Sequence, residues 1–413
     1  MKSAKFICLS LLISTGIVPC SRAEPYRTDI NPALLYYRAF LLSPNLSPAD
    51  HDYLFTTNWQ GQKLPERFGK IVAGYDNELK LVREAAQQKV PCDWGIDMSP
   101  GPGTLLPQLA PAKRIAQAAR LRAMWDLQHG NQARARDDLV AAFALGRNAS
   151  RDGTLIGALV QIAIEVIQCN TVAENFGQFS PETLKQLADG FDAAPARGSV
   201  AAAITAEKLY SHDWRANKIR ALQQENPGND AKVMEAVRGY IGYADDFEDT
   251  NLWQHVLIAS GGTSDGVLKL IRDMGPLYPR LARIMTLPLP EYEDQIQKFG
   301  AEIRESQNPF VQAVFTDLLR TRGKEFRIQA EQAMVRAAVE YKLHGESGLK
   351  SVMDPFGKGP FGFQRFVFEG VDRGFELKSA YAGLGYPYAL IFVEKEGPPF
   401  RVDGPHIGEA VQP

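Results

Sequence analysis

Two glutamates in otherwise apolar stretches are the residues of this sequence best suited to proton chemistry. Residues 154–169 are rich in Leu, Ile and Val, and the polar exceptions Gln161, Glu165 and Gln168 lie on one stripe of a predicted helix. Glu207 lies in a second apolar stretch. If the two helices are neighbours, the carboxylates face each other, and an apolar site with a second carboxylate raises a carboxyl pKa. Such a pair would serve general acid–base catalysis, as in glycoside hydrolysis.

The same glutamates also have a structural interpretation. Glu165 would then lie with Gln161 and Gln168 on the wetted side of a half-buried helix, and Glu207 would pair with an arginine. Because structural ion pairs perturb carboxylates as catalytic sites do, the residue types alone do not separate the two interpretations.

Aromatic and histidine side chains accompany Glu207 in the helix predicted at 199–222. Tyr210 and Trp214 share a face with Glu207, and His212 lies between them in sequence. Ligand pockets are typically lined by aromatic side chains and a few polar groups. We therefore predict Tyr210, His212 and Trp214 as binding residues if Glu207 lines a groove.

Three further motifs do not indicate catalysis or metal binding. The run at 211–213 has the residue types of a hydrolase triad, but neighbours on a helix point in different directions. The acidic cluster at 245–249 lacks the calcium-loop pattern, and the glycines at 261–266 lack a phosphate-loop lysine. The run at 261–266 is expected to begin a helix, capped by Ser264 or Asp265. The six histidines show no metal-ligand spacing, so we predict no metal site and no cofactor.

The first 23 residues have the layout of a secretory signal. Two lysines precede an apolar run at 6–18, and small residues lead to a cleavage site after Ala23. At 13 residues the run is too short to span a membrane as a helix. Modification of Cys20 by lipid is less favoured, because Pro19 stands where lipoproteins have a small residue. The sequence therefore predicts a periplasmic or secreted protein.

Charge and hydropathy narrow the class of partner. Removal of the signal leaves 43 basic and 48 acidic residues, a formal charge of −5. Nucleic acid is therefore not the expected partner, since phosphate binding relies on a basic surface. No stretch after the signal is apolar enough to indicate a membrane span.

Two cysteines, Cys92 and Cys169, remain in the mature chain. In an oxidising compartment they would form one disulfide. The alternative is two buried, unpaired thiols, and the sequence does not give the distance that decides between them.

Helical periodicity dominates as far as residue 345, and strand patterns follow it. Helix-start signals in which Asn or Ser precedes Pro occur at residues 31–32, 180–181 and 308–309. Strands are predicted at 365–369, 375–378 and 388–394. We predict a signal peptide at 1–23, a helical domain at 24–345 and a β-rich appendage at 346–413. The fold class is mainly α, an irregular array of helices with a small C-terminal β appendage.

Two segments resemble known families. Residues 121–135 resemble a tetratricopeptide-type helical hairpin, with Gly130 at the turn and small residues after it, over one unit of about 34 residues. The segment Arg327 to Lys378 is similar to one in large families of uncharacterised exported bacterial proteins, through Ala337 to Gly345 and then Asp354 to Gly357. Its layout also looks like the C-terminal half of type II secretion pseudopilins. The resemblance implies a packing unit and carries over no catalytic residue.

These observations leave two hypotheses for function. The first is a non-catalytic envelope protein whose helical layers bind a protein or peptide, because stacked helix pairs form concave binding surfaces. The second is a periplasmic hydrolase of a glycan-type polymer that uses Glu165 and Glu207. We favour the first. Carboxyl groups more than about 10 Å apart would exclude the second in this form.

Overall fold

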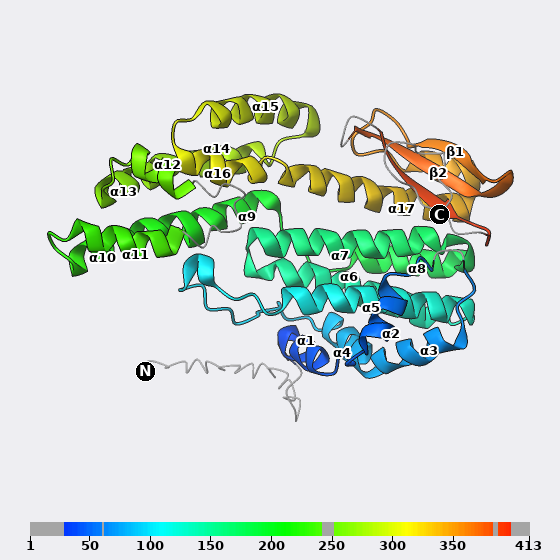
Figure 1. Cartoon of the computed structure of the whole chain (residues 1–413). Coiled ribbons are helices and arrows are strands. Elements are labelled where there is room, and N and C mark those ends of the chain that lie inside the picture. The colour runs from blue at the N-terminus through cyan, green and yellow to red at the C-terminus, as the bar shows by residue number, and fades with distance from the viewer. Residues whose placement is uncertain (1–28, 60–61, 242–251, 383–386, 398–413) are drawn as a thin grey trace, which may run out of the picture.

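The computed structural model describes residues 29–59, 62–241, 252–382 and 387–397. These residues form α-helices and one three-stranded antiparallel sheet near the C-terminus (Figure 1). The predicted fold class, mainly α with a small β appendage, is confirmed. The predicted signal peptide, Cys20 and the acidic cluster at 245–249 lie outside the described residues.

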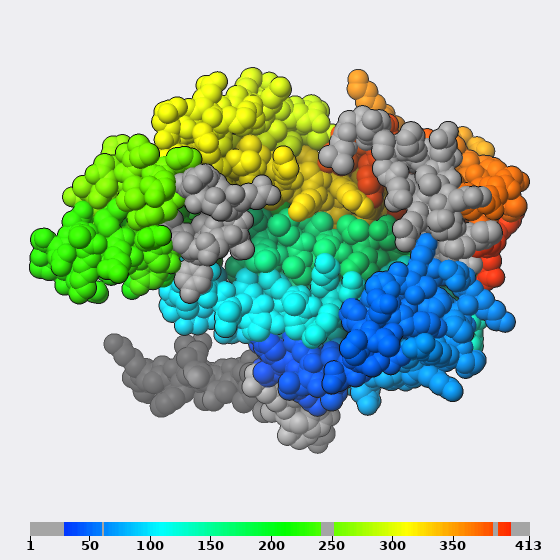
Figure 2. Space-filling view, in the orientation of Figure 1, coloured from blue at the N-terminus to red at the C-terminus, as the bar shows by residue number. Residues whose placement is uncertain are grey.

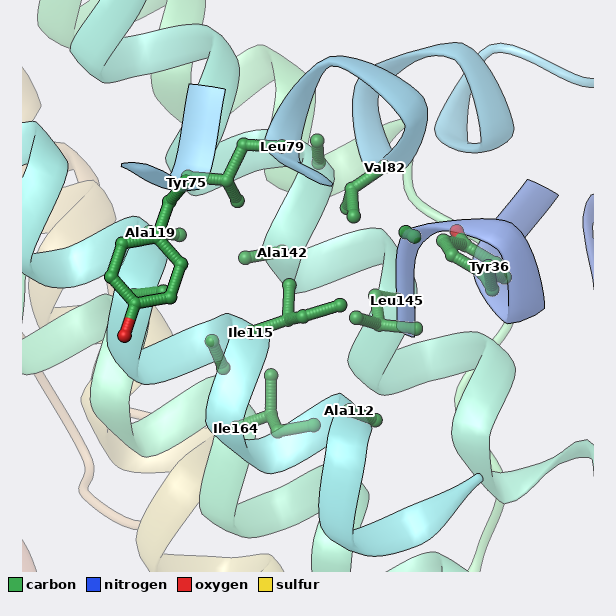
Figure 3. Close-up of a cluster of buried hydrophobic side chains, with 14 of the residues drawn as sticks. Tyr36, Tyr75, Leu79, Val82, Ala112, Ile115, Ala119, Ala142, Leu145 and Ile164 are labelled. Carbon is green, nitrogen blue, oxygen red and sulfur yellow. The ribbon is translucent and has the colours of Figure 1, made fainter. Parts of the chain in front are cut away.

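The N-terminal helices pack on the middle of the molecule through an apolar core. Tyr36, Leu79, Val82, Ile115 and Leu145 are fully buried and point toward one another (Figure 3). The four helices of this layer are α1 (Pro32–Leu41), α2 (Pro48–Phe55), α3 (Glu66–Val72) and α4 (Asp76–Ala86).

A helical hairpin and two further helices form the middle of the molecule. They are α5 (Leu109–Gln128), α6 (Gln132–Ala149), α7 (Leu155–Glu174) and α8 (Pro181–Asp192). Gly130 turns the chain between α5 and α6 with a φ of +76°, a conformation that glycine adopts without strain. Buried alanines on both helices let the two backbones pack closely. The helical hairpin is therefore present, and its likeness to a tetratricopeptide unit stays a prediction.

A third group of helices forms a lobe with its own apolar core, at the left of Figure 2. The chain enters it through α9 (Val200–Glu207), a π-helical turn (Lys208–Asp213) and α10 (Trp214–Glu225). The remaining helices are α11 (Asp230–Ile241), α12 (Leu252–Ala259), α13 (Ser264–Met274), α14 (Leu277–Ile284), α15 (Leu289–Glu305) and α16 (Pro309–Leu318). Thr263 caps α13, one residue before the predicted cap.

The last helix leads into the sheet. Helix α17 (Thr321–Ser351) is kinked at Gly345, where φ is 66° and ψ is −148°. Strands β1 (Gly362–Phe368), β2 (Val371–Ala382) and β3 (Pro387–Val393) follow in the order β1-β2-β3. Phe375, Leu377 and Phe392 of the sheet belong to the same apolar core as α7, α8 and α17.

Helix α7 lies at the centre of the molecule, in contact with α5, α6, α17 and β3 (Figure 1). Among the described residues it alone has the length and apolar composition of a membrane-spanning helix, although the sequence predicts no stretch after residue 23 that is apolar enough for one. A buried helix in the core of a folded protein has the same composition. Because α7 is packed against α5, α6, α17 and β3, we interpret it as such a core helix.

Candidate functional site at the amino end of α7

The polar stripe of α7 is turned into the protein. Gln161, Glu165 and Gln168 are fully buried, so the prediction that they form a wetted side is wrong. Glu165 forms ion pairs with Arg147 of α6 and with Arg197, which precedes α9. Two guanidinium groups thus neutralise one buried carboxylate, the arrangement of a structural ion-pair network.

Glu207 lies at the opposite end of the contact between α7 and α9. Its Oε1 accepts a hydrogen bond from the backbone N–H of Leu155 at 3.3 Å, at the first residue of α7. Glu165 is ten residues further along this helix, or about 15 Å at 1.5 Å per residue. The structure therefore does not bring the two glutamates together as a catalytic pair. The arginine nearest in effect is Arg215, whose positive charge lowers the pKa of Glu207 against the rise caused by burial.

The carboxylate neighbour of Glu207 is Asp152. Asp152 Oδ1 accepts hydrogen bonds from the backbone N–H and the hydroxyl of Thr154, each at 2.9 Å, and Oδ2 accepts one from Gln108 Nε2 at 2.8 Å. Burial raises the pKa of both carboxyl groups, and the negative charge of Asp152 raises that of Glu207 further. The run Asp152-Gly153-Thr154 directly before an apolar helix is a helix-start signal that could have identified this residue from sequence.

A loop at 99–108 contacts Asp152, just before α7, through Gln108 and reaches the lobe through Ser99. Trp214 Nε1 donates a hydrogen bond to the carbonyl oxygen of Ser99 at 2.9 Å. Gly101 has a φ of +64°, and a Cβ atom there would lie 2.4 Å from the Trp214 ring. Because only glycine permits both the conformation and the approach, the loop is fitted to the tryptophan.

The π-helical turn carries the predicted binding residues Tyr210 and His212. His212 is buried; its Nδ1 lies 2.7 Å from Asp213 Oδ1, and its Nε2 lies 2.7 Å from the carbonyl oxygen of Ile271 in α13. Tyr210 is half-buried. Single π-helical turns are frequent at functional sites.

Ser211 does not complete a triad with its two neighbours. Its hydroxyl accepts a hydrogen bond from Arg215 Nη1, one helical turn later. The acceptors at the His212 ring are Asp213 and a backbone carbonyl, so no nitrogen of the ring is directed at the serine. The geometry agrees with the argument from sequence that adjacent residues do not form this machinery.

Exposed apolar side chains lie on the segments that carry or contact the two carboxylates. Leu105 is 83% exposed, Leu209 57% and Ile156 55%. Ile156 follows the residue that Glu207 binds, and Leu209 lies two residues after Glu207. We call this region the junction surface: Leu105, Asp152, Ile156, Glu207, Leu209, Tyr210 and Trp214.

Cys92 and Cys169 are both free, buried thiols in the structure. Cys92 belongs to the core shared by α1, α4 and α5, whereas Cys169 belongs to the core shared by α7, α8 and α17. Burial raises the pKa of Cys92 to about 12 and also raises that of Cys169. Cys92 and Cys169 therefore form no disulfide in the structure. They are buried, unpaired thiols of low reactivity.

A shallow pocket lies away from the predicted residues. It has a volume of about 280 Å³ and lies between α14 and α15. Its polar lining consists of side chains of both charges and one amide: Arg280, Arg283, Glu291, Asp294 and Gln295. Within the described ranges, no group of three or more His, Cys, Asp or Glu side chains could hold a metal ion.

Comparison of the chain with family models, curated proteins and solved structures finds no significant match.

Proposed function

We propose that the mature chain is a non-catalytic helical scaffold of the cell envelope that binds a protein or peptide segment at the junction surface. The observation that carries this proposal is the exposure of Leu105, Ile156 and Leu209 on the segments that carry or contact Asp152 and Glu207. Apolar side chains exposed together around polar groups are typical of interaction sites.

The chemistry of the junction surface specifies the segment it fits. Asp152 and Glu207 form no ion pair with any residue that the structure describes, and the carbonyl oxygen of buried Gln108 has no hydrogen-bond donor there. The present donors are Thr154 and Gln108 at Asp152 and Leu155 at Glu207, and Arg215 is the cation whose charge acts on Glu207. A Lys or Arg side chain of a ligand would add a direct ion pair to these carboxylates. The expected ligand is therefore an apolar segment that carries a basic residue.

Site-specific photo-cross-linking in intact cells tests this proposal. The photoreactive residue is placed at Leu209 or Leu105, and at Leu41 and Ile258 as matched controls that are 85% and 79% exposed elsewhere. We expect one reproducible product from the first two positions and none from the controls. The cross-linked peptide should contain apolar residues and a Lys or Arg. Equal products from all four positions would show that the junction surface is not selective.

A charge substitution then tests the mode of binding. Leu209→Glu places a further carboxylate beside Glu207 and should reduce capture of the same partner at least about tenfold, as expected for a central interface residue. Ile258→Glu changes a more exposed residue, 79% against 57% for Leu209, and should leave capture unchanged. An unaffected yield with Leu209→Glu would contradict binding at this surface.

Envelope localisation is part of the proposal and is supported by the layout of residues 1–23. Cell fractionation followed by mass spectrometry of the N-terminus should find a chain that begins at Glu24. A protein that retains Met1 in the cytoplasmic fraction would overturn it.

The raised pKa values of Asp152 and Glu207 favour a second candidate, acid–base hydrolysis of a glycan. In this candidate the catalytic carboxyl groups are those of Asp152 and Glu207, in place of the pair Glu165 and Glu207 expected from sequence. The purified protein should then release reducing ends from cell-wall glycan, and Glu207→Gln and Asp152→Asn should each abolish the release. The same rate in both variants and the parent would exclude it.

A further inference from the structure

The pocket between α14 and α15 is formed by one face of each helix. The two helices lie against each other in the lobe and are joined by residues 285–288 (Figure 1). Positions 280, 283 and 284 of α14 and positions 291, 294 and 295 of α15 line the pocket, and both sets have the i, i+3, i+4 spacing of a helix face. The volume of about 280 Å³ is at the small end of the range for ligand pockets, so an occupant must be small.

The turn that joins the two helices fixes the shape of the pocket. The backbone N–H groups of residues 285–287 each donate a hydrogen bond to a carbonyl oxygen of α14, at 2.9 to 3.1 Å. Pro288 and Pro290 restrict the backbone that follows. The apolar part of the lining consists of Ile284, which is 4% exposed, and Leu287, which is partly buried. The pocket is therefore preformed and has an apolar patch.

Two of the four charged side chains that line the pocket are already neutralised. Arg280 lies 2.6 Å from a carboxylate oxygen of Glu302, and its guanidinium lies 5.0 Å from the centre of the Phe299 ring. Asp294 forms an ion pair with Lys298 at 2.8 Å. These contacts hold Arg280 and Asp294 in place as walls of the pocket.

Arg283 and Glu291 are the other two charged side chains of the lining. Among the residues that the structure describes, neither side chain has an ion-pair or hydrogen-bond partner. Arg283 lies in the last turn of α14 and Glu291 in the first turn of α15, where the helix dipoles favour a cation and an anion respectively. One positive and one negative group thus remain free to bind a ligand that carries both signs of charge.

We propose that this pocket binds a small zwitterion with an aliphatic side chain, an amino acid or a dipeptide. Arg283 binds the carboxylate, because a guanidinium group offers it two parallel N–H donors. Glu291 binds the ammonium group, and Ile284 and Leu287 contact the aliphatic chain. The lining carries two positive and two negative side chains, so it matches a ligand without net charge better than a simple anion or cation. None of these residues belongs to the junction surface, so this binding is a property of the lobe that adds to the proposed function.

Nuclear magnetic resonance of the mature chain with ¹³C-labelled isoleucine methyl groups tests the proposal. The probes are L-leucine and the dipeptide glycyl-L-leucine, and an Ile284→Val variant assigns the methyl resonance of Ile284. We expect a saturable shift of this resonance with a Kd of about 1 mM or lower, and the tighter of the two probes identifies the class of zwitterion. No saturable shift at Ile284 with either probe up to about 20 mM would overturn the proposal.

Blocked analogues test whether both charges of the ligand are recognised. N-Acetyl-L-leucine lacks the ammonium group and L-leucinamide lacks the carboxylate. Each should bind at least about tenfold more weakly than L-leucine, because one charge-assisted contact is lost. Equal binding of L-leucine and both analogues would contradict recognition of a zwitterion.

Substitution of the two free charges tests their roles. Arg283→Gln and Glu291→Gln should each weaken binding of the tighter probe at least about tenfold. Arg283→Gln should also abolish the preference for L-leucine over L-leucinamide. The matched controls are Arg272→Gln in the last turn of α13 and Glu182→Gln in the first turn of α8, which should leave binding unchanged. All four side chains are exposed, so the variants should fold like the parent chain. Unchanged binding in Arg283→Gln and Glu291→Gln would show that the pocket does not hold the ligand by these charges.

Discussion

Glu165 shows how a charged side chain is accommodated in α7, the long apolar helix at the centre of the described structure. Its carboxylate is fully buried, and Arg147 and Arg197 approach it from α6 and from the segment before α9. Gln161 on the same stripe accepts a hydrogen bond from the backbone N–H of Gly198 at 2.9 Å. The inward stripe thus fixes the position of the segment that leads into the lobe.

Neutralising Glu165 should therefore destabilise the fold. Glu165→Gln leaves two partly buried guanidinium groups without their counter-ion, and removal of one member of a buried ion pair costs about 3–5 kcal/mol. Urea unfolding followed by far-UV circular dichroism measures this cost. Glu302→Gln is the control, because its pair with Arg280 is exposed and should contribute less than about 1 kcal/mol. Similar losses in both variants would contradict the assignment.

Glu78 of α4 makes stability depend on pH in a defined direction. Burial raises its pKa from 4.5 to about 7, although Ser43 donates a hydrogen bond to it. The folded state therefore binds more protons than the unfolded state between these values, and stability falls as pH rises from about 4.5 to about 7. At 1.36 kcal/mol per pKa unit the loss is about 3 kcal/mol above pH 7.

The Glu78→Gln variant isolates this effect, because the amide resembles the protonated acid. Relative to the parent chain, it should be of similar stability near pH 4 and about 3 kcal/mol more stable near pH 8. Denaturant unfolding of both chains across this range gives the difference. A difference that does not change with pH would show that the carboxyl group titrates alike in the folded and unfolded states.

The roles of single polar residues were only partly predictable from sequence. The spacing of Gln161, Glu165 and Gln168 placed them on one stripe, but sequence does not reveal which side of a central helix faces arginines from other elements. The same holds for Glu207, whose acceptor role depends on the free N–H groups at the start of α7.

At the scale of elements, the loop at 99–108 and the π-helical turn depend on each other. Ser99 and Gly101 of the loop both contact the side chain of Trp214, the residue that directly follows the π-helical turn. Two elements more than 100 residues apart in sequence are thus joined through one aromatic ring.

Substitution of Gly101 should disrupt this contact. Gly101→Ala requires an unfavourable positive φ and pushes a methyl group into the Trp214 ring, with an expected cost of about 2–4 kcal/mol. Gly103→Ala, two residues away, has no atom within 4 Å of its Cβ and no positive φ, and should change stability by less than about 1 kcal/mol. Thermal unfolding of the two variants makes the comparison. Equal midpoints would mean that the loop does not rest on Trp214.

Elements with local signals were predicted well, and those set by tertiary contacts were not. The side chains of Asn31, Ser180 and Asn308 cap helices as predicted, and the three strands lie where alternation placed them. The π-helical turn has no local signal, because it arises where His212 and Trp214 meet partners from α13 and the loop. Its residues read as a continuous α-helix in sequence.

At the scale of the whole molecule, the small sheet is packed into the helical body. Phe375 and Phe392 are fully buried and contact Phe176, which follows α7. Tyr388 of β3 donates a hydrogen bond to buried Glu331 of α17. The sheet and the helices are therefore expected to unfold together.

Truncation of a sheet side chain tests this cooperativity. Phe375→Ala should lower stability by about 3–5 kcal/mol, and the loss should be visible in the helical signal at 222 nm. Val371→Ala, at an exposed position of the same strand, should change it by less than about 1 kcal/mol. A helical transition that is unchanged by Phe375→Ala would mean that the sheet unfolds as a separate unit.

The central position of α7 has a consequence for synthesis of the chain. This helix is complete by residue 174, but two of the elements that cover it, α17 and β3, are encoded about 150 to 220 residues later. While the ribosome extends the intervening chain, this long apolar helix lacks part of its final cover. Contacts so distant in sequence slow folding and leave intermediates prone to aggregation. A nascent chain released before α17 should therefore require a chaperone to stay in solution.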